Sequence, residues 1–354
     1  MEKSRPAKTE TSDSNGALTS RRQAKLIPLL TLVCACSLWH AFGQTQVTRQ
    51  TDEAVVRVST NLVTVPVAVL DRNGRFIPDL TIDQFHIYED GVEQKIVHFD
   101  SAEKPFTLAL MLDVSDSARF KLKEIQDAAA IFVKQLHSND RVMIVAFDRN
   151  VTILSEPASD RTVVTESIYG ARTGGGTSLY NALDVVMKQR LSRIAGRKAI
   201  VLFTDGVDTT SAGASYASTL REAQELDALV YAIQYDTYSD RAGAGANPTK
   251  SQTAVTLTTR SGELLNLAYT RATRYLRLLT QQSGGRFYYA DSPAQLARSF
   301  ARIAAELRQQ YALAYYPTSK GSDSQKREIR VRVAVPNVVV RARKSYIHRA
   351  KQND

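Results

Sequence analysis

Five oxygen-bearing side chains in three separate segments are the residues of this chain best suited to chemistry. They are Asp113, Ser115, Ser117, Thr177 and Asp205. The first three form a D-x-S-x-S run directly after an apolar segment, Thr177 follows a run of glycines, and Asp205 stands in a T-D-G sequence after a second apolar segment. Carboxylates and hydroxyls, with no Cys or His among them, are the ligands that a hard divalent cation such as Mg2+ prefers. The pattern therefore predicts a binding site built around a metal.

These residues sit where a particular fold would bring them together. From Phe106 onward, apolar strand segments alternate with segments of helical periodicity, which is typical of a parallel sheet covered on both faces. The predicted fold class is α/β, with a doubly wound, mostly parallel, Rossmann-like sheet and flanking β-rich segments. Open sheets of this kind bind ligands at the carboxyl ends of their strands. Asp113 and Asp205 both follow predicted strands, and the Thr177 loop precedes a predicted helix, so we expect all three segments at one edge of the sheet.

The order of these motifs resembles the von Willebrand factor type A domain, the fold of integrin I domains, with its metal-ion-dependent adhesion site. The resemblance covers residues 105–308, and all five motif positions are filled. It implies that Ser115, Ser117 and Thr177 coordinate the metal directly and that the two aspartates do so directly or through water. It also implies Mg2+ (or Mn2+ or Ca2+) as the cofactor and a protein partner that presents an Asp or Glu carboxylate. The whole chain is similar to an exported bacterial family of such proteins named for acidobacteria.

The same five residues have a purely structural interpretation. Asp113 can form an Asx turn and Ser117 can cap a helix, with no metal involved. Asp208, three residues after Asp205, is interpreted as a residue that solvates its loop rather than as a sixth ligand.

Three arginines next to the predicted site loops suggest a basic rim that would steer an acidic partner toward the metal. They are Arg119, Arg149 and Arg172. Solvated surface arginines are the alternative interpretation.

Two β-rich segments flank the α/β domain, at 54–104 and 309–349. Pro66 within the first predicted strand indicates an edge position, because proline cannot donate to a sheet ladder. The segments Phe85–Tyr88 and Lys95–Phe99 are expected to form a hairpin. The C-terminal segment contains a strand with alternating valines and arginines, which indicates a half-buried strand with a basic outer face. The two flanking segments are expected to pack together as one β module.

Residues 237–262 interrupt the alternation of strands and helices with a Gly-, Ala- and Thr-rich insert of low apolar content. Such a composition predicts a mobile segment. It leaves the sheet edge that carries the predicted site, so it is either a lid or specificity element or a tolerated surface insertion.

The first 43 residues have the order of an export signal: basic residues, an apolar run and a small-x-small cleavage site. Retention of this leader as an uncleaved membrane anchor is the alternative. A polar linker, 44–53, follows. Both cysteines, Cys34 and Cys36, lie in the leader, so a mature chain would contain no disulfide. We therefore expect an exported protein that is periplasmic, associated with the cell envelope or secreted.

Catalysis and nucleic-acid binding have little support in the sequence. The histidines are scattered, no zinc signature or nucleophile elbow occurs, and the glycine loop lacks the lysine of a phosphate-binding loop. The net charge of +10 is not accompanied by a basic motif interleaved with aromatic residues. The leading hypothesis is a non-enzymatic adhesion module that grips a partner's acidic residue through the metal. The alternatives are a scaffold in which the metal only stabilises the α/β domain and, less favoured, a metal-dependent hydrolase.

Overall fold

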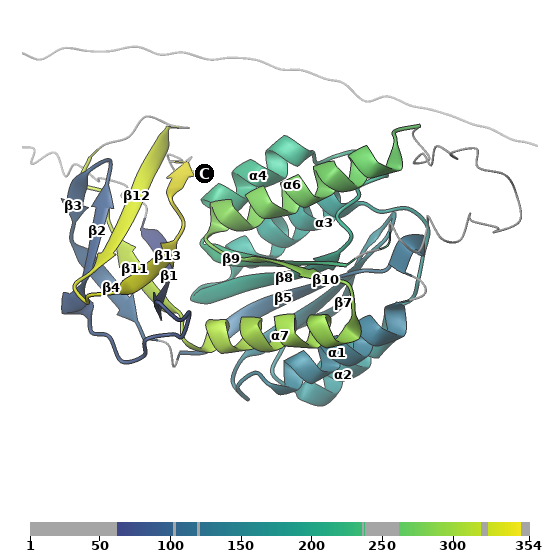
Figure 1. The fold of residues 1–354 in the computed structure, drawn as a ribbon, viewed down its shortest axis with the longest axis horizontal. Helices are drawn as coiled ribbons and strands as arrows, with labels where there is room; N and C mark the ends of the chain where they lie inside the picture. The colour runs from purple at the N-terminus through teal and green to yellow at the C-terminus, as the bar shows by residue number, and fades with distance from the viewer. Residues whose placement is uncertain are drawn as a thin grey trace, which may run out of the picture. The chain divides into compact units, whose positions relative to one another are not determined.

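The computed structural model describes residues 62–101, 104–118, 121–235, 237, 262–319 and 325–347 (Figure 1). The predictions for the leader, the linker and nearly all of the 237–262 insert fall outside these residues. Within the described ranges, no helix is long and apolar enough to span a membrane.

A six-stranded sheet, in the order β10-β9-β8-β5-β6-β7, forms the centre of the α/β domain. Its strands are β5 (Phe106–Asp113), β6 (Arg141–Phe147), β7 (Val151–Ala158), β8 (Arg197–Thr204), β9 (Ala228–Tyr235) and β10 (Phe287–Ala290). All neighbours are parallel except β7, which is antiparallel to β6. The predicted fold class, a mostly parallel α/β sheet, is confirmed.

Helices cover both faces of this sheet (Figure 1). One face packs against α1 (Leu122–Lys134), α2 (Arg161–Gly170) and α7 (Pro293–Arg308), and the other against α3 (Leu179–Asp184), α4 (Tyr216–Glu225) and α6 (Leu265–Ser283). Because successive strand residues point to opposite faces, Leu110 and Met111 of β5 enter different cores, and both are fully buried. The continuous apolar run of β5 is thus the consequence of burial on two sides.

The β-rich segments form two four-stranded sheets with the orders β13-β1-β11-β4 and β14-β12-β2-β3. The strands are β1 (Val63–Asp71), β2 (Phe85–Glu89), β3 (Val92–Gln94), β4 (Ile96–Asp100), β11 (Tyr311–Tyr315), β12 (Lys326–Val333), β13 (Val338–Ala342) and β14 (Ser345–Ile347). Each sheet contains strands from both sides of the α/β domain in sequence; for example, Val63 pairs with Tyr315. Residues of both sheets share one apolar core.

Two details of this region were predicted wrongly. Pro66 does not lie in an edge strand, since β1 runs between β11 and β13. The proline is tolerated because it pairs only with β11, whereas the ladder to β13 begins at Val67. The hairpin partner of β2 is β3 rather than the 95–99 segment, which crosses to the other sheet as β4 and pairs with β11. Asp90 and Gly91, both with positive φ, form the two-residue turn that closes the β2–β3 hairpin.

Candidate metal centre

The site lies where β5 and β8 end side by side. The chain leaves β5 toward α1 on one face of the sheet and leaves β8 toward α4 on the other. Connections that diverge in this way open a crevice at the carboxyl ends of the strands, the usual place for a ligand in such sheets. Asp113 is the last residue of β5, and Asp205 follows the last residue of β8.

Asp113 is fully buried, and each of its carboxylate oxygens accepts a hydrogen bond. Oδ1 accepts from the backbone N–H of Ser115 at 3.0 Å, which is the Asx turn considered above. Oδ2 accepts from the hydroxyl of Thr204 at 2.6 Å, and that hydroxyl in turn accepts from the N–H of Gly206 at 2.9 Å. The end of β8 therefore fixes the orientation of the carboxylate at the end of β5.

The two serines of the D-x-S-x-S run lie next to each other. The Oγ atoms of Ser115 and Ser117 are 2.9 Å apart. The run is attached to the glycine loop, because Gly174 donates its N–H to the carbonyl of Val114 at 2.9 Å and Ser115 forms a parallel bridge with Gly174. A side chain at position 174 would meet the carboxylate of Asp148, so the close approach requires glycine.

The glycine loop places Thr177 next to the loop that contains Asp205. The carbonyl of Thr177 accepts from the N–H groups of Thr209 and Thr210 at 2.8 and 3.0 Å, and its own N–H donates to Oγ1 of Thr209 at 2.8 Å. Gly176 has φ of +80°, which turns the backbone just before Thr177. Thr177 is only 4 % exposed, so its side chain is shielded from bulk solvent.

Asp205 is held by residues that the sequence did not single out. Its Oδ1 accepts from the N–H of Val207 at 2.9 Å. Its Oδ2 accepts from the hydroxyls of Thr237, which follows β9, at 2.9 Å and of Tyr269, on α6, at 3.4 Å. The two hydroxyl contacts join residues far apart in the chain, so no local sequence pattern predicts them.

Asp208 has a different role from the one predicted. Instead of solvating its loop, its Oδ1 accepts from the N–H of Tyr180, in the first turn of α3, at 3.2 Å. The same oxygen accepts from the hydroxyl of Ser211 at 2.6 Å. Burial raises the pKa of the Asp208 carboxyl, and hydrogen bonds from Ser211 and from the backbone of α3 oppose that shift. Asp208 thus caps the helix that follows Thr177 from the loop that follows Asp205.

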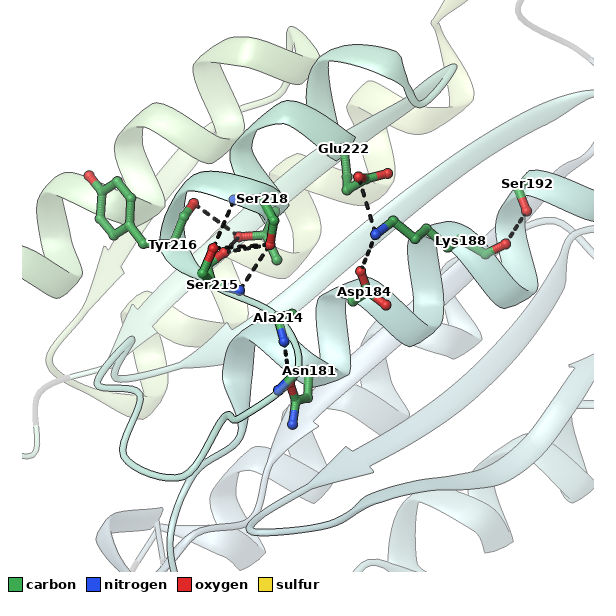
Figure 2. Close-up of polar contacts among 11 residues, drawn as sticks. Asn181, Asp184, Lys188, Ser192, Ala214, Ser215, Tyr216, Ser218 and Glu222 are labelled. Carbon is green, nitrogen blue, oxygen red and sulfur yellow. Dashed lines mark hydrogen bonds and ion pairs between the residues drawn. The ribbon is translucent and has the colours of Figure 1, made fainter. Parts of the chain in front are cut away.

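A second contact connects α3 to the loop that follows Asp205. Oδ1 of Asn181, on α3, accepts from the N–H of Ala214 at 2.8 Å, directly before the Ser215 cap of α4 (Figure 2). Farther along, Lys188 forms ion pairs with Asp184 at 2.6 Å and with Glu222 of α4 at 3.3 Å (Figure 2). The Thr177 and Asp205 loops therefore form one unit.

Two aspartates in this crevice lie close enough to affect each other's charge. Burial, and then the neighbouring charge of Asp205, raises the pKa of Asp113 to about 7. Neither aspartate forms an ion pair with a described Lys, Arg or His side chain. Two buried carboxylates without a cationic side chain are a costly arrangement, and a bound cation would remove that cost.

The donor set fits a hard divalent cation. Within the described ranges no cluster holds three or more His, Cys, Asp or Glu side chains. Only two carboxylates are available here, and the remaining protein ligands would be the hydroxyls of the two serines and Thr177. Such a set leaves positions for water or for an oxygen from outside the chain.

The arginines of the predicted rim differ in their placement. Arg149 is exposed beside the glycine loop, and its Cβ lies 3.7 Å from the position that a Cβ on Gly176 would occupy. Arg172 is also exposed, but its guanidinium donates to the carbonyls of Tyr169 and Ala171 at the end of α2, at 2.6 and 3.1 Å. Arg119 lies outside the described residues.

Comparison with known proteins identifies the α/β domain. Residues 108–207 match the family model described as the von Willebrand factor type A domain. The chain carries a von Willebrand factor type A domain. The match spans β5 to β8 and includes all five residues of the candidate metal centre. No curated protein matches the chain.

Several solved structures are similar to this one at low sequence identity. A von Willebrand factor type A protein from Catenulispora acidiphila is 10 % identical with a TM-score of 0.45, covering 77 % of this chain and 75 % of that one. The corresponding domain of the type V pili tip protein Mfa5 from Porphyromonas gingivalis is 15 % identical with a TM-score of 0.42, covering 56 % and 94 %. Proximal thread matrix protein 1 from the mussel byssus, with a zinc-occupied MIDAS motif, is 12 % identical with a TM-score of 0.44, covering 63 % and 50 %.

Proposed function

We propose that this chain is a metal-dependent adhesion module that grips an acidic residue of a protein partner through a divalent cation. Asp113, Ser115, Ser117, Thr177 and Asp205 would hold the cation, with Mg2+ as the expected metal and Mn2+ or Ca2+ as substitutes. When bound, the cation supplies an open coordination position that accepts a carboxylate oxygen. The leader pattern of residues 1–43 supports placement in the periplasm, at the cell envelope or outside the cell.

One observation carries this proposal: the buried pair of Asp113 and Asp205 at adjacent strand ends. Each carboxylate is already oriented by hydrogen bonds from residues of other elements, such as Thr204 and Thr237. Because residues of neighbouring elements hold these carboxylates in place, little ordering would oppose metal binding.

A binding rather than a catalytic role is part of the proposal. The described histidines His86 and His98 lie on strands of the β-rich sheets, and His137 follows α1. None of them is at the ends of β5 and β8, so no described histidine is placed to act as the general base for a metal-bound water.

Calorimetric titration of the full chain with Mg2+ and Mn2+ tests the metal. We expect saturable binding that is lost in Asp113→Ala and retained in Asp291→Ala, a matched change at an exposed aspartate before α7. A folded wild-type chain that binds neither ion would refute the proposal.

Thr177 separates adhesion from a scaffold in which the metal only stabilises the domain. We expect capture of an acidic partner to require Mg2+, to be lost in Thr177→Ala and to be restored in Thr177→Ser, which keeps the hydroxyl. Partner capture that survives Thr177→Ala would favour the scaffold instead.

A further inference from the structure

A hollow lies on the outer face of the β14-β12-β2-β3 sheet, away from every residue of the metal centre. Its volume is ≈ 670 Å³, which is large enough to hold one or two sugar-sized groups. The lining residues are Tyr88, Gly91, Glu328, Ile329, Arg330, Arg332 and Lys344.

Strand alternation places the charges of β12 on opposite sides of the sheet. Arg327 points inward, is 4 % exposed and pairs with the buried Glu89 at 3.1 Å. Arg330 and Arg332 point outward and are exposed. Neither of them, nor Lys344, forms an ion pair with another described residue. The inner arginine is therefore structural, whereas the outer cations have no ionic partner among the described residues.

The position of one outer arginine is defined by an aromatic ring. The guanidinium carbon of Arg332 lies 5.2 Å from the ring centroid of Tyr88, which pairs with Arg330 across the ladder between β2 and β12. A cation over an aromatic face is held in place by the ring's electrostatic field. Arg332 therefore presents its guanidinium group from a defined position on the face of the sheet.

The lining combines three cations with one carboxylate, and this combination limits the classes of ligand that the hollow can bind. Guanidinium and ammonium groups only donate hydrogen bonds, so they favour an anionic ligand. Glu328 only accepts, so it repels a bare polyanion but binds a ligand that also carries hydroxyl groups. We propose that the hollow binds an acidic polysaccharide, with sugar carboxylates against Arg330 and Arg332 and sugar hydroxyls against Glu328.

A polysaccharide fits this surface better than an acidic peptide. Peptides commonly add to a sheet at an exposed edge, through main-chain hydrogen bonds. The hollow instead opens on the face of the sheet, where the side chains of Tyr88, Arg330 and Arg332 line it. Recognition must therefore come from the side chains of the sheet face.

Calorimetric titration of the full chain with polygalacturonate, a polymer of acidic sugars, tests this proposal. Neutral dextran and polyglutamate serve as comparison polymers, and all titrations are made in EDTA so that the metal centre plays no part. We expect polygalacturonate to bind and the double variant Arg330→Glu/Arg332→Glu to weaken it at least about tenfold, since hydrogen bonds to charged groups are the strong ones. The matched control is Arg298→Glu/Arg302→Glu, the same charge change at exposed arginines of α7, which should leave the affinity within about twofold.

Glu328→Ala distinguishes sugar recognition from simple charge attraction. Loss of the acceptor should weaken polygalacturonate binding although the surface becomes more positive, whereas attraction by charge alone would become stronger. The proposal is overturned if this variant binds more tightly, if the α7 control loses as much affinity as the β12 variant, or if the wild type does not bind. Polyglutamate binding of equal strength, with the same losses, would assign the hollow to acidic peptides instead. Because the metal is absent throughout, failure here would leave the proposed adhesion function untouched.

Discussion

At the scale of single residues, the metal centre depends on glycines that bring backbones close together. Gly174, Gly175 and Gly176 are adjacent in sequence but meet different surroundings. Gly176 combines a positive φ with a close neighbour, since an added Cβ would lie 2.8 Å from Cγ2 of Thr210. For Gly175 the nearest atom would be Oδ2 of Asp116, at an ordinary contact distance of 3.7 Å.

This difference gives a prediction for two neighbouring substitutions. Gly176→Ala should destabilise the chain by about 1–2 kcal/mol, because a side chain in the left-handed region is strained. Gly175→Ala should be neutral or slightly stabilising, because it reduces the freedom of the unfolded chain. Urea unfolding of both variants measures the free energies. Equal losses would show that the backbone conformation at Gly176 is not what requires glycine.

At the scale of elements, the site depends on one helix being capped from another loop. Asp208 caps α3 across the chain, whereas Asp160 caps α2 locally, with its Oδ1 accepting from the N–H of Thr162 at 2.8 Å. Each carboxylate accepts a hydrogen bond from a backbone N–H in the first turn of its helix. Of these two caps, only that of Asp208 connects the Thr177 loop to the Asp205 loop.

The two caps therefore form a matched pair for experiment. Asp208→Ala and Asp160→Ala should each cost about 0.5–2 kcal/mol of stability, the usual effect of removing a capping side chain. Only Asp208→Ala should weaken Mn2+ binding, by about tenfold, because support of metal ligands by outer residues has effects of that order. Urea unfolding and calorimetric titration of both variants make the comparison. Unchanged Mn2+ affinity in Asp208→Ala would mean that the two loops do not depend on this contact.

The difference between local contacts and contacts made across the chain explains what the sequence could predict. The alternation of apolar strand segments with helical periodicity after Phe106 predicted a parallel sheet covered by helices, because these signals are local. The strand-end positions of Asp113 and Asp205 were likewise predictable from apolar runs. The roles of Asp208, Thr237 and Tyr269 were not, because each depends on a partner brought close only by the tertiary fold. The partner of β2 was missed for a similar reason: the segment 95–99 alternates like a hairpin strand, but its partner β11 is more than two hundred residues away in sequence.

At the scale of the whole molecule, buried arginines connect the β-rich sheets to the α/β domain. Arg343, between β13 and β14, is 3 % exposed. Its guanidinium donates to the carbonyl of Leu226, at the end of α4, at 3.4 Å and also to the carbonyl of Thr64 on β1. Burial lowers the pKa of Arg343 below its usual range, although the charge of Asp227 partly opposes this shift.

Removal of this connection should be visible in the unfolding of the whole chain. Arg343→Met keeps much of the apolar stem but leaves buried carbonyls without a donor, so we expect a loss of about 1.5–3 kcal/mol. Arg308→Met, at an exposed position near the end of α7, is the control and should change stability by less than about 0.5 kcal/mol. Urea unfolding followed by far-ultraviolet circular dichroism and by tyrosine fluorescence measures both. A wild-type stability retained in Arg343→Met would show that this arginine does not link the two parts.

The pairing of β1 with β11 and β13 has a consequence for the time course of folding. Val63 cannot meet Tyr315 until the ribosome has made all the residues up to 315, whereas β5 to β8 need only the residues between 106 and 204. Closing so long a loop is slow, and sheets built from distant strands form late. The strands β5 to β8 can therefore associate before β1 has its neighbours, while the apolar residues of β1 are exposed. During synthesis that strand is therefore a segment that we expect to need protection by a chaperone.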